Sequence, residues 1–125
     1  MSNTVLLKRI WQSVYDPNLD LRSVIKQYFH PQYEQCINGV IMNVDDYIDH
    51  VIEQKQNMQI DSIDYKQMIE AGDEVFALYY PKGFNRENMP VEAEVIAYFQ
   101  FKENQLLKIH GQVRLVKGNL SDVDM

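Results

Sequence analysis

The feature that most limits the fold is a change in the spacing of apolar residues near residue 58. From residue 5 to residue 58 they recur every three or four positions, which is the period of one helix face. From residue 60 to residue 117 they alternate with polar residues, which is the period of a half-buried β-strand. The chain therefore divides into a mainly helical half followed by a sheet half.

Three helices are predicted in the first half, over residues 5–15, 21–29 and 44–58. Each carries an apolar stripe on one face. Pro17 separates the first two, because proline cannot donate an amide hydrogen bond and disfavours helix in the residue before it. Asp20 and Asn43 are placed to cap the second and third helices. A short run around Asn38-Gly39 is typical of short strands joined by a turn.

The second half reads as strands separated by turn residues. We expect strands over residues 60–69, 74–80, 92–102 and 106–117. Gly72-Asp73 and Glu103-Asn104-Gln105 supply residue types that favour turns. Helices that gather on one face of an antiparallel sheet make an α+β domain, which is the predicted fold class.

Length and charge limit the class of protein. At 125 residues we expect one domain at residues 1–118, followed by an acidic tail at 119–125. The 12 basic and 18 acidic residues give a net charge of −6, which argues against binding to nucleic acid. We find neither a secretory signal pattern nor the roughly 18 apolar residues that a membrane span needs. We therefore expect a cytoplasmic protein with no membrane or nucleic-acid partner.

Four motifs, in a fixed order, carry a resemblance to a known family. They are Tyr28-Phe29-His30-Pro31-Gln32-Tyr33-Glu34-Gln35, the step from Tyr47 to His50, Glu70-Ala71-Gly72-Asp73-Glu74-Val75, and Phe99-Gln100-Phe101 followed by Leu106-Leu107. Over nearly its whole length the chain resembles the SnoaL-like branch of the NTF2-like superfamily. The resemblance implies three helices packed in a strongly curved antiparallel sheet, which forms a cone with an apolar pocket, and a homodimer through the sheet.

The resemblance does not imply one activity. The superfamily includes polyketide cyclases, ketosteroid isomerases, dehydratases, epoxide hydrolases and members with no known reaction, so function has to be argued from the site. Two departures from the branch stand out. Cys36 stands where the branch often has histidine, and Lys108 and His110 stand where it often has glutamate and tryptophan.

His110 is the main catalytic candidate. Lys108, His110, Gln112 and Arg114 share one face of the last strand, because side chains alternate along a strand. If that face lines the cone, the neighbouring cations favour a neutral imidazole, which could act as a base near neutral pH. If it is the solvated or dimer-facing side, His110 is a surface residue.

His50 and Asp64 are the other catalytic candidates. His50 lies near the edge of the third helix's buried stripe. Chemistry of the isomerase kind needs a carboxylic acid in the pocket, often beside a tyrosine hydroxyl. Asp61 and Asp64 have opposite parity on their strand, so only one of them can face inward. Asp16 follows Tyr15 at the end of the first helix.

The pocket lining is predicted from tyrosines and from the polar face of the last strand. We expect it to include Tyr15, Tyr28, Cys36, Tyr47, Tyr98, Lys108 and Gln112. Each tyrosine offers an apolar ring and one hydroxyl, although the same rings could instead fill the core. The lone cysteine excludes an internal disulfide, and the three histidines show no metal-ligand spacing, so we expect neither a metal nor another cofactor.

Two functions stay open on this sequence. The first is a small-molecule pocket protein of the SnoaL-like type, acting without a cofactor as a cyclase, isomerase or hydrolase on an apolar carbonyl compound. The second is a non-catalytic domain that binds a ligand or a protein partner and dimerises. The direction of the face that carries His110 discriminates between them.

Overall fold

The computed structural model describes residues 2–118, so the predicted acidic tail at 119–125 lies outside the described residues. The helices are α1 (Asn3–Val14), α2 (Leu21–Tyr28) and α3 (Val44–Asn57). The strands are β1 (Phe29–Ile37), β2 (Val40–Asn43), β3 (Met58–Ala71), β4 (Glu74–Asn85), β5 (Pro90–Lys102) and β6 (Gln105–Lys117). The predicted α+β class is confirmed.

Each helix begins at a residue whose side chain accepts a hydrogen bond from an otherwise unpaired backbone amide. Ser2 accepts from Val5 at the start of α1, and Asp20 accepts from Ser23 at the start of α2. Asn43 and Asp46 form a reciprocal capping box at the start of α3. The predicted caps Asp20 and Asn43 are therefore confirmed.

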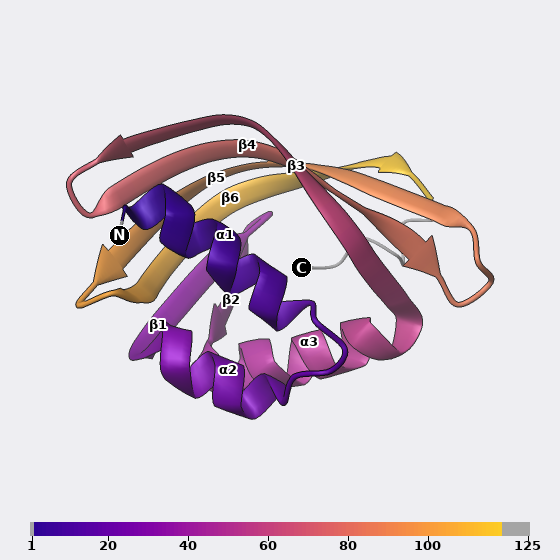
Figure 1. The fold of residues 1–125 in the computed structure, drawn as a ribbon, viewed down its shortest axis with the longest axis horizontal. Coiled ribbons are helices and arrows are strands. Elements are labelled where there is room, and N and C mark those ends of the chain that lie inside the picture. Colours follow the sequence, from indigo (N-terminus) through magenta and orange to yellow (C-terminus); the bar gives the residue numbers. More distant parts are fainter. Residues whose placement is uncertain (1, 119–125) are drawn as a thin grey trace.

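The six strands form one open sheet in the order β2-β1-β6-β5-β4-β3, and it arches over the three helices (Figure 1). Every neighbouring pair is antiparallel except β1 and β6, which run parallel. The sheet is thus mixed rather than purely antiparallel. The reason is topological: α3 follows the β1–β2 hairpin, and the β3–β6 meander then returns its last strand to the side of β1.

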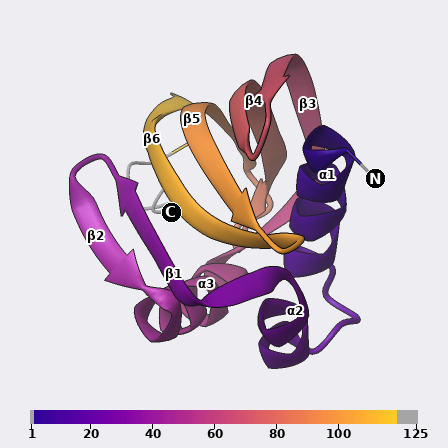
Figure 2. The same cartoon turned by 90° about the vertical axis from the view of Figure 1, so that its left-hand side faces the viewer.

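The core lies between the helices and the concave face of the sheet. Trp11 of α1 packs edge-on against Phe99 of β5, with ring centroids 6.2 Å apart. Turning the view shows α1 beside β3 at one end of the arch and α2 and α3 beneath β1 and β2 (Figure 2). Among residues 2–118, no helix has the length and apolar character that crossing a membrane requires.

Candidate functional site

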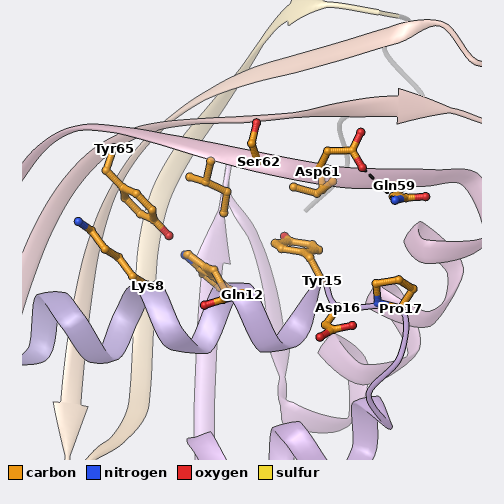
Figure 3. A pocket seen from close by; sticks show the side chains of 12 residues that line it. Lys8, Gln12, Tyr15, Asp16, Pro17, Gln59, Asp61, Ser62 and Tyr65 are labelled. Carbon is orange, nitrogen blue, oxygen red and sulfur yellow. Dashed lines mark hydrogen bonds between the residues drawn. The ribbon is translucent and has the colours of Figure 1, made fainter.

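A cleft of about 420 Å³ opens between α1 and the first half of β3 (Figure 3). Its lining comes from α1, from the connection that follows α1 and from β3. The lining residues are Lys8, Trp11, Gln12, Tyr15, Asp16, Pro17, Gln59, Ile60, Asp61, Ser62, Ile63 and Tyr65. Apolar rings and branched chains thus meet hydroxyl, amide and charged groups in one cleft, which is the usual composition of a small-molecule site.

The side chains of the cleft approach one another from two sides. Lys8, Gln12 and Tyr15 extend from the α1 side toward β3, and Tyr65 extends from β3 toward them (Figure 3). The Lys8 ammonium lies 5.2 Å from the centre of the Tyr65 ring, which is cation–π geometry. The entrance of the cleft therefore presents a cation and two phenols.

A β-bulge shapes the β3 wall. Ile60 pairs with Gly83 and Ser62 pairs with Lys82, so Asp61 is an extra residue in β3. The bulge lets Ile60 and Ile63 both line the cleft, although their spacing would place them on opposite faces of a regular strand. Bulges commonly redirect side chains beside functional sites.

Gly83 allows β4 to pass close to this bulge. A Cβ atom at Gly83 would lie only 1.7 Å from the backbone carbonyl oxygen of Gln59. Only glycine therefore fits here without moving β3, and with it the wall of the cleft.

The opposite wall, α1, is held at both ends by side chains from other elements. At its start, the Glu70 carboxylate accepts backbone hydrogen bonds from Asn3 at 3.2 Å and Thr4 at 3.0 Å. At its end, the Lys55 ammonium donates to the carbonyl oxygens of Val14 at 2.9 Å and Asp16 at 3.3 Å. Both charges also match the helix dipole, negative at the N-terminus and positive at the C-terminus.

Five phenols in and below the cleft are neutral hydrogen-bonding groups. Burial raises the pKa of all five: Tyr15, Tyr33, Tyr47, Tyr65 and Tyr79. For Tyr15, at the mouth, burial raises the pKa to about 12. A phenol with a raised pKa keeps its proton at neutral pH and can donate it to a ligand oxygen.

Two buried polar atoms lack a well-formed hydrogen bond in the described part of the chain, although the Trp11 indole is close enough to the Tyr79 hydroxyl to offset part of the rise that burial causes in the pKa of that phenol. They are the indole nitrogen of Trp11 and the hydroxyl of Tyr47, both buried. The neighbouring Tyr33, by contrast, donates to the Gln35 side-chain oxygen at 2.7 Å. Unpaired buried polar groups are uncommon in proteins, and a ligand or a water can satisfy them.

Comparison with solved structures identifies this architecture. A proposed isomerase from Rhodopseudomonas palustris superposes with a TM-score of 0.79 at 8% identity, covering 90% of each chain. A proposed polyketide cyclase from Streptomyces antibioticus, IdmH, gives 0.73 at 7% identity over 90% of this chain and 92% of its own. An NTF2-like protein of unknown function from Cytophaga hutchinsonii superposes with a TM-score of 0.61 at 12% identity, covering 88% of this chain and 97% of its own. This chain has the NTF2-like fold.

Sequence comparison adds a distant relative. An uncharacterised protein of Schizosaccharomyces pombe is 18% identical over 119 residues, which cover 95% of this chain and 91% of the relative. No protein-family model matches the chain. At these identities the likeness establishes the NTF2-like fold and leaves the activity to be argued from the site.

The face that carries His110 points away from the helices of this NTF2-like domain. Lys108, His110 and Gln112 are exposed on the outer side of β6, beside the exposed Phe76 and Ile96. They do not share a site with the cleft phenols. Tyr98 is on the same outer side, where its hydroxyl donates to the Glu74 carboxylate at 2.7 Å. The chemistry of the cleft therefore has to be argued without His110, and a catalytic role for His110 elsewhere stays a prediction.

The remaining predicted residues other than the tyrosines lie outside the cleft, and Cys36 pairs in register with His110 across β1 and β6. Asp64 forms ion pairs with Lys66 at 3.1 Å and Lys82 at 3.9 Å, away from the cleft. His50 and Cys36 are half-buried, on α3 and β1. In residues 2–118 no three His, Cys, Asp or Glu side chains are grouped to hold a metal ion.

Three predicted tyrosines have clear positions. Tyr15 lines the cleft, Tyr47 is buried beneath it with an unpartnered hydroxyl, and Tyr28 packs half-buried at the edge of the core. The sequence analysis did not select Trp11 or Lys8. The sequence does contain a pattern that could have identified both residues, because Lys8, Trp11 and Tyr15 follow one another at three- and four-residue steps along one helix face.

Proposed function

We propose that this chain binds a small apolar carbonyl compound in the cleft between α1 and β3. The observation that carries the proposal is the cleft itself, in which an aromatic and aliphatic lining meets the neutral phenols of Tyr15 and Tyr65. Apolar walls favour an apolar body, and a few converging donors orient a single oxygen. The isomerase and cyclase proposals for proteins of the same fold support this ligand class.

The finer proposal is cofactor-independent proton transfer, of the cyclase, isomerase or hydrolase kind. A carbonyl oxygen that gains negative charge in the transition state is stabilised by preorganised donors, and the Tyr15 and Tyr65 phenols would serve as these donors. The base that we propose is Asp16, which lines the cleft next to Tyr15. One Asp16 oxygen accepts from the Asn18 amide at 2.9 Å, which holds the carboxylate in place.

Thermal shift against a panel of hydrophobic ketones and epoxides tests the binding proposal. We expect at least one member to raise the melting temperature in proportion to the logarithm of its concentration. Tyr15→Phe should weaken the binding of that ligand about three- to tenfold, which is the effect of losing one hydrogen bond. Tyr98→Phe, the matched change on the outer face, should leave it unchanged. If the two variants behave alike, the ligand does not occupy this cleft.

Asp16→Asn tests the chemical proposal separately. It preserves the size of the side chain and removes the basic carboxylate, so turnover of a bound carbonyl compound should fall about a hundredfold or more while binding persists. Unchanged turnover would exclude Asp16 as the base.

A second candidate function, dimerisation through the sheet, has its own observation. Ile69, Phe76 and Ile96 are 64%, 55% and 58% exposed on the outer face, which is unusual for large apolar residues grouped on one sheet. We propose that a second copy of this chain covers them. Sedimentation should show a dimer that Ile96→Glu converts to a monomer, and a wild-type chain that stays monomeric at every concentration overturns the idea.

We also propose a cytoplasmic location, on the basis of the single free thiol.

A further inference from the structure

Three neighbouring hollows lie along the start of β3, and together they are called the groove below. The first is the α1–β3 cleft, and the second is a hollow of about 70 Å³ between Tyr15, Pro17 and the end of α3. The third, of about 300 Å³, lies between the end of α3 and the connection from β4 to β5. Gln59 lines all three hollows. The three hollows are therefore adjacent, and they follow one another from α1 to the end of α3.

The two ends of this groove differ in chemistry. The α1 end is lined by rings and branched chains, chiefly Trp11, Tyr15, Ile60 and Ile63. The far end is lined by five carboxamides, Gln56, Asn57, Gln59, Asn85 and Asn88. A carboxamide offers an acceptor oxygen and two donor hydrogens, as a set of hydroxyl groups requires from its partners. Gln59 already donates to the Asp61 carboxylate at 2.9 Å, and Asn57 donates to the Glu53 carbonyl at 3.1 Å. The principal contacts to a ligand are therefore assigned to Gln56 and Asn88.

The charges at the far end are of both signs and favour neither a cation nor an anion strongly. Lys55 and Arg86 would repel a cation. Asp61 and the carbonyl end of α3, which ends at Asn57, would repel an anion. The far end is therefore suited to a neutral polar group.

The wall at the far end is already formed. The Asn85 side-chain oxygen accepts from the backbone amides of Glu87 and Met89, both at 3.0 Å, and these bonds fix the connection between β4 and β5. A preformed wall spares a ligand the entropy of ordering a loop.

We propose that the ligand is an amphiphile whose apolar body lies between α1 and β3 and whose neutral, polyhydroxylated head lies against the carboxamides. A glycoside of an aromatic compound has this form. The inference rests on the proposed function, because it assumes that the α1–β3 cleft holds the apolar body.

The ketone 6-acetyl-2-naphthol, called naphthol below, and its β-glucoside form a matched pair of probes, since they share the apolar carbonyl body and differ only in the sugar. Titration calorimetry should show the glucoside binding about three- to tenfold more tightly, the gain from one or two net hydrogen bonds. The double variant Gln56→Ala/Asn88→Gly should abolish this difference and leave naphthol affinity unchanged. Glycine is chosen at residue 88 because Asn88 has φ of 60°, which glycine adopts without strain.

Gln27→Ala is the control. Like Gln56, Gln27 is an exposed glutamine in the last turn of a helix, but it belongs to α2 and lines none of the three hollows. It should bind both probes as the wild type does. If naphthol binds and the glucoside binds no more tightly, the head site is excluded and the cleft proposal stands. If neither probe binds, or if Tyr15→Phe weakens neither, the cleft proposal fails and the head site with it.

Discussion

The Lys55 ammonium, on α3, donates to the carbonyl oxygen of Val14 at 2.9 Å, where α1 ends. A second bond at 3.3 Å goes to the carbonyl of Asp16, so one side chain satisfies two carbonyls at a helix end. Burial lowers the pKa of Lys55 while the nearby Asp16 opposes the change. Lys55 thus ties the third helix to the mouth of the cleft.

Lys55→Met should lower the free energy of unfolding by about 1–2 kcal/mol, because it keeps most of the aliphatic stem and removes two charge-assisted hydrogen bonds. Urea denaturation measures the loss. Lys26→Met is the matched control, since Lys26 is an exposed basic residue in the last turn of α2. Equal stability of the two variants would show that the Lys55 bonds contribute nothing net.

Gly83→Ala should destabilise the fold by about 2 kcal/mol or more, because its Cβ would meet the Gln59 carbonyl oxygen at 1.7 Å. The strain falls on β3, so affinity for a cleft ligand should fall as well. Gly72→Ala is the comparison: it has φ of 60° but no atom within 4 Å of the new Cβ, and backbone strain alone costs about 1 kcal/mol. Chemical denaturation of both variants should rank Gly83→Ala as the more damaging.

Tyr47→Phe and Tyr33→Phe should change stability in opposite directions. Tyr47 has a buried hydroxyl without a partner, so removing it relieves a desolvation cost and should leave the apo protein equal or more stable. Tyr33→Phe removes a hydrogen bond to the buried Gln35 and should cost about 1–2 kcal/mol. Thermal and urea unfolding of the two variants measure the contrast. A large loss of stability for Tyr47→Phe would show that its hydroxyl is satisfied in the folded protein.

Local features of this fold could be predicted from the sequence. The caps at Asp20 and Asn43 and the three helices depend on residues close together in the chain, and the observed helices match the predicted ones to within two residues at either end. The apolar side of β6 was also visible, because Ile109 and Gly111 are buried and His110 between them is exposed.

The site could not be predicted in the same way, because it depends on non-local pairing. The parallel register that places Cys36 beside His110 requires β6 to return to β1 after the whole meander. The bulge at Asp61 breaks the alternation on which the inward-facing residues of β3 were judged. A regular strand would turn only one of Asp61 and Asp64 inward. In the bulged strand Asp61 lines the cleft and Asp64 pairs with lysines outside it.

Stability should fall steeply as the solution is made alkaline. The pKa of Tyr15, Tyr33, Tyr47, Tyr65 and Tyr79 is raised in the folded protein, so the unfolded chain loses these protons first, near pH 10. Their contribution is complete below about pH 10 and is lost as the pH rises through the folded values, at about 1.4 kcal/mol per pH unit for each phenol. Lys55, with its lowered pKa, gives the opposite slope but is one group against five.

Urea midpoints measured between about pH 9 and about pH 11 should therefore drop. The tyrosinate absorbance of the five buried phenols should rise together with loss of helix signal rather than before it. Tyr65→Phe removes one of the five phenols. The fall of the unfolding free energy with pH should then be shallower by the contribution of one proton, about 1.4 kcal/mol per pH unit. More than three tyrosinates forming with an ordinary midpoint while the helices persist would contradict the burial of these rings, because three of the eight tyrosines lie outside this set of five.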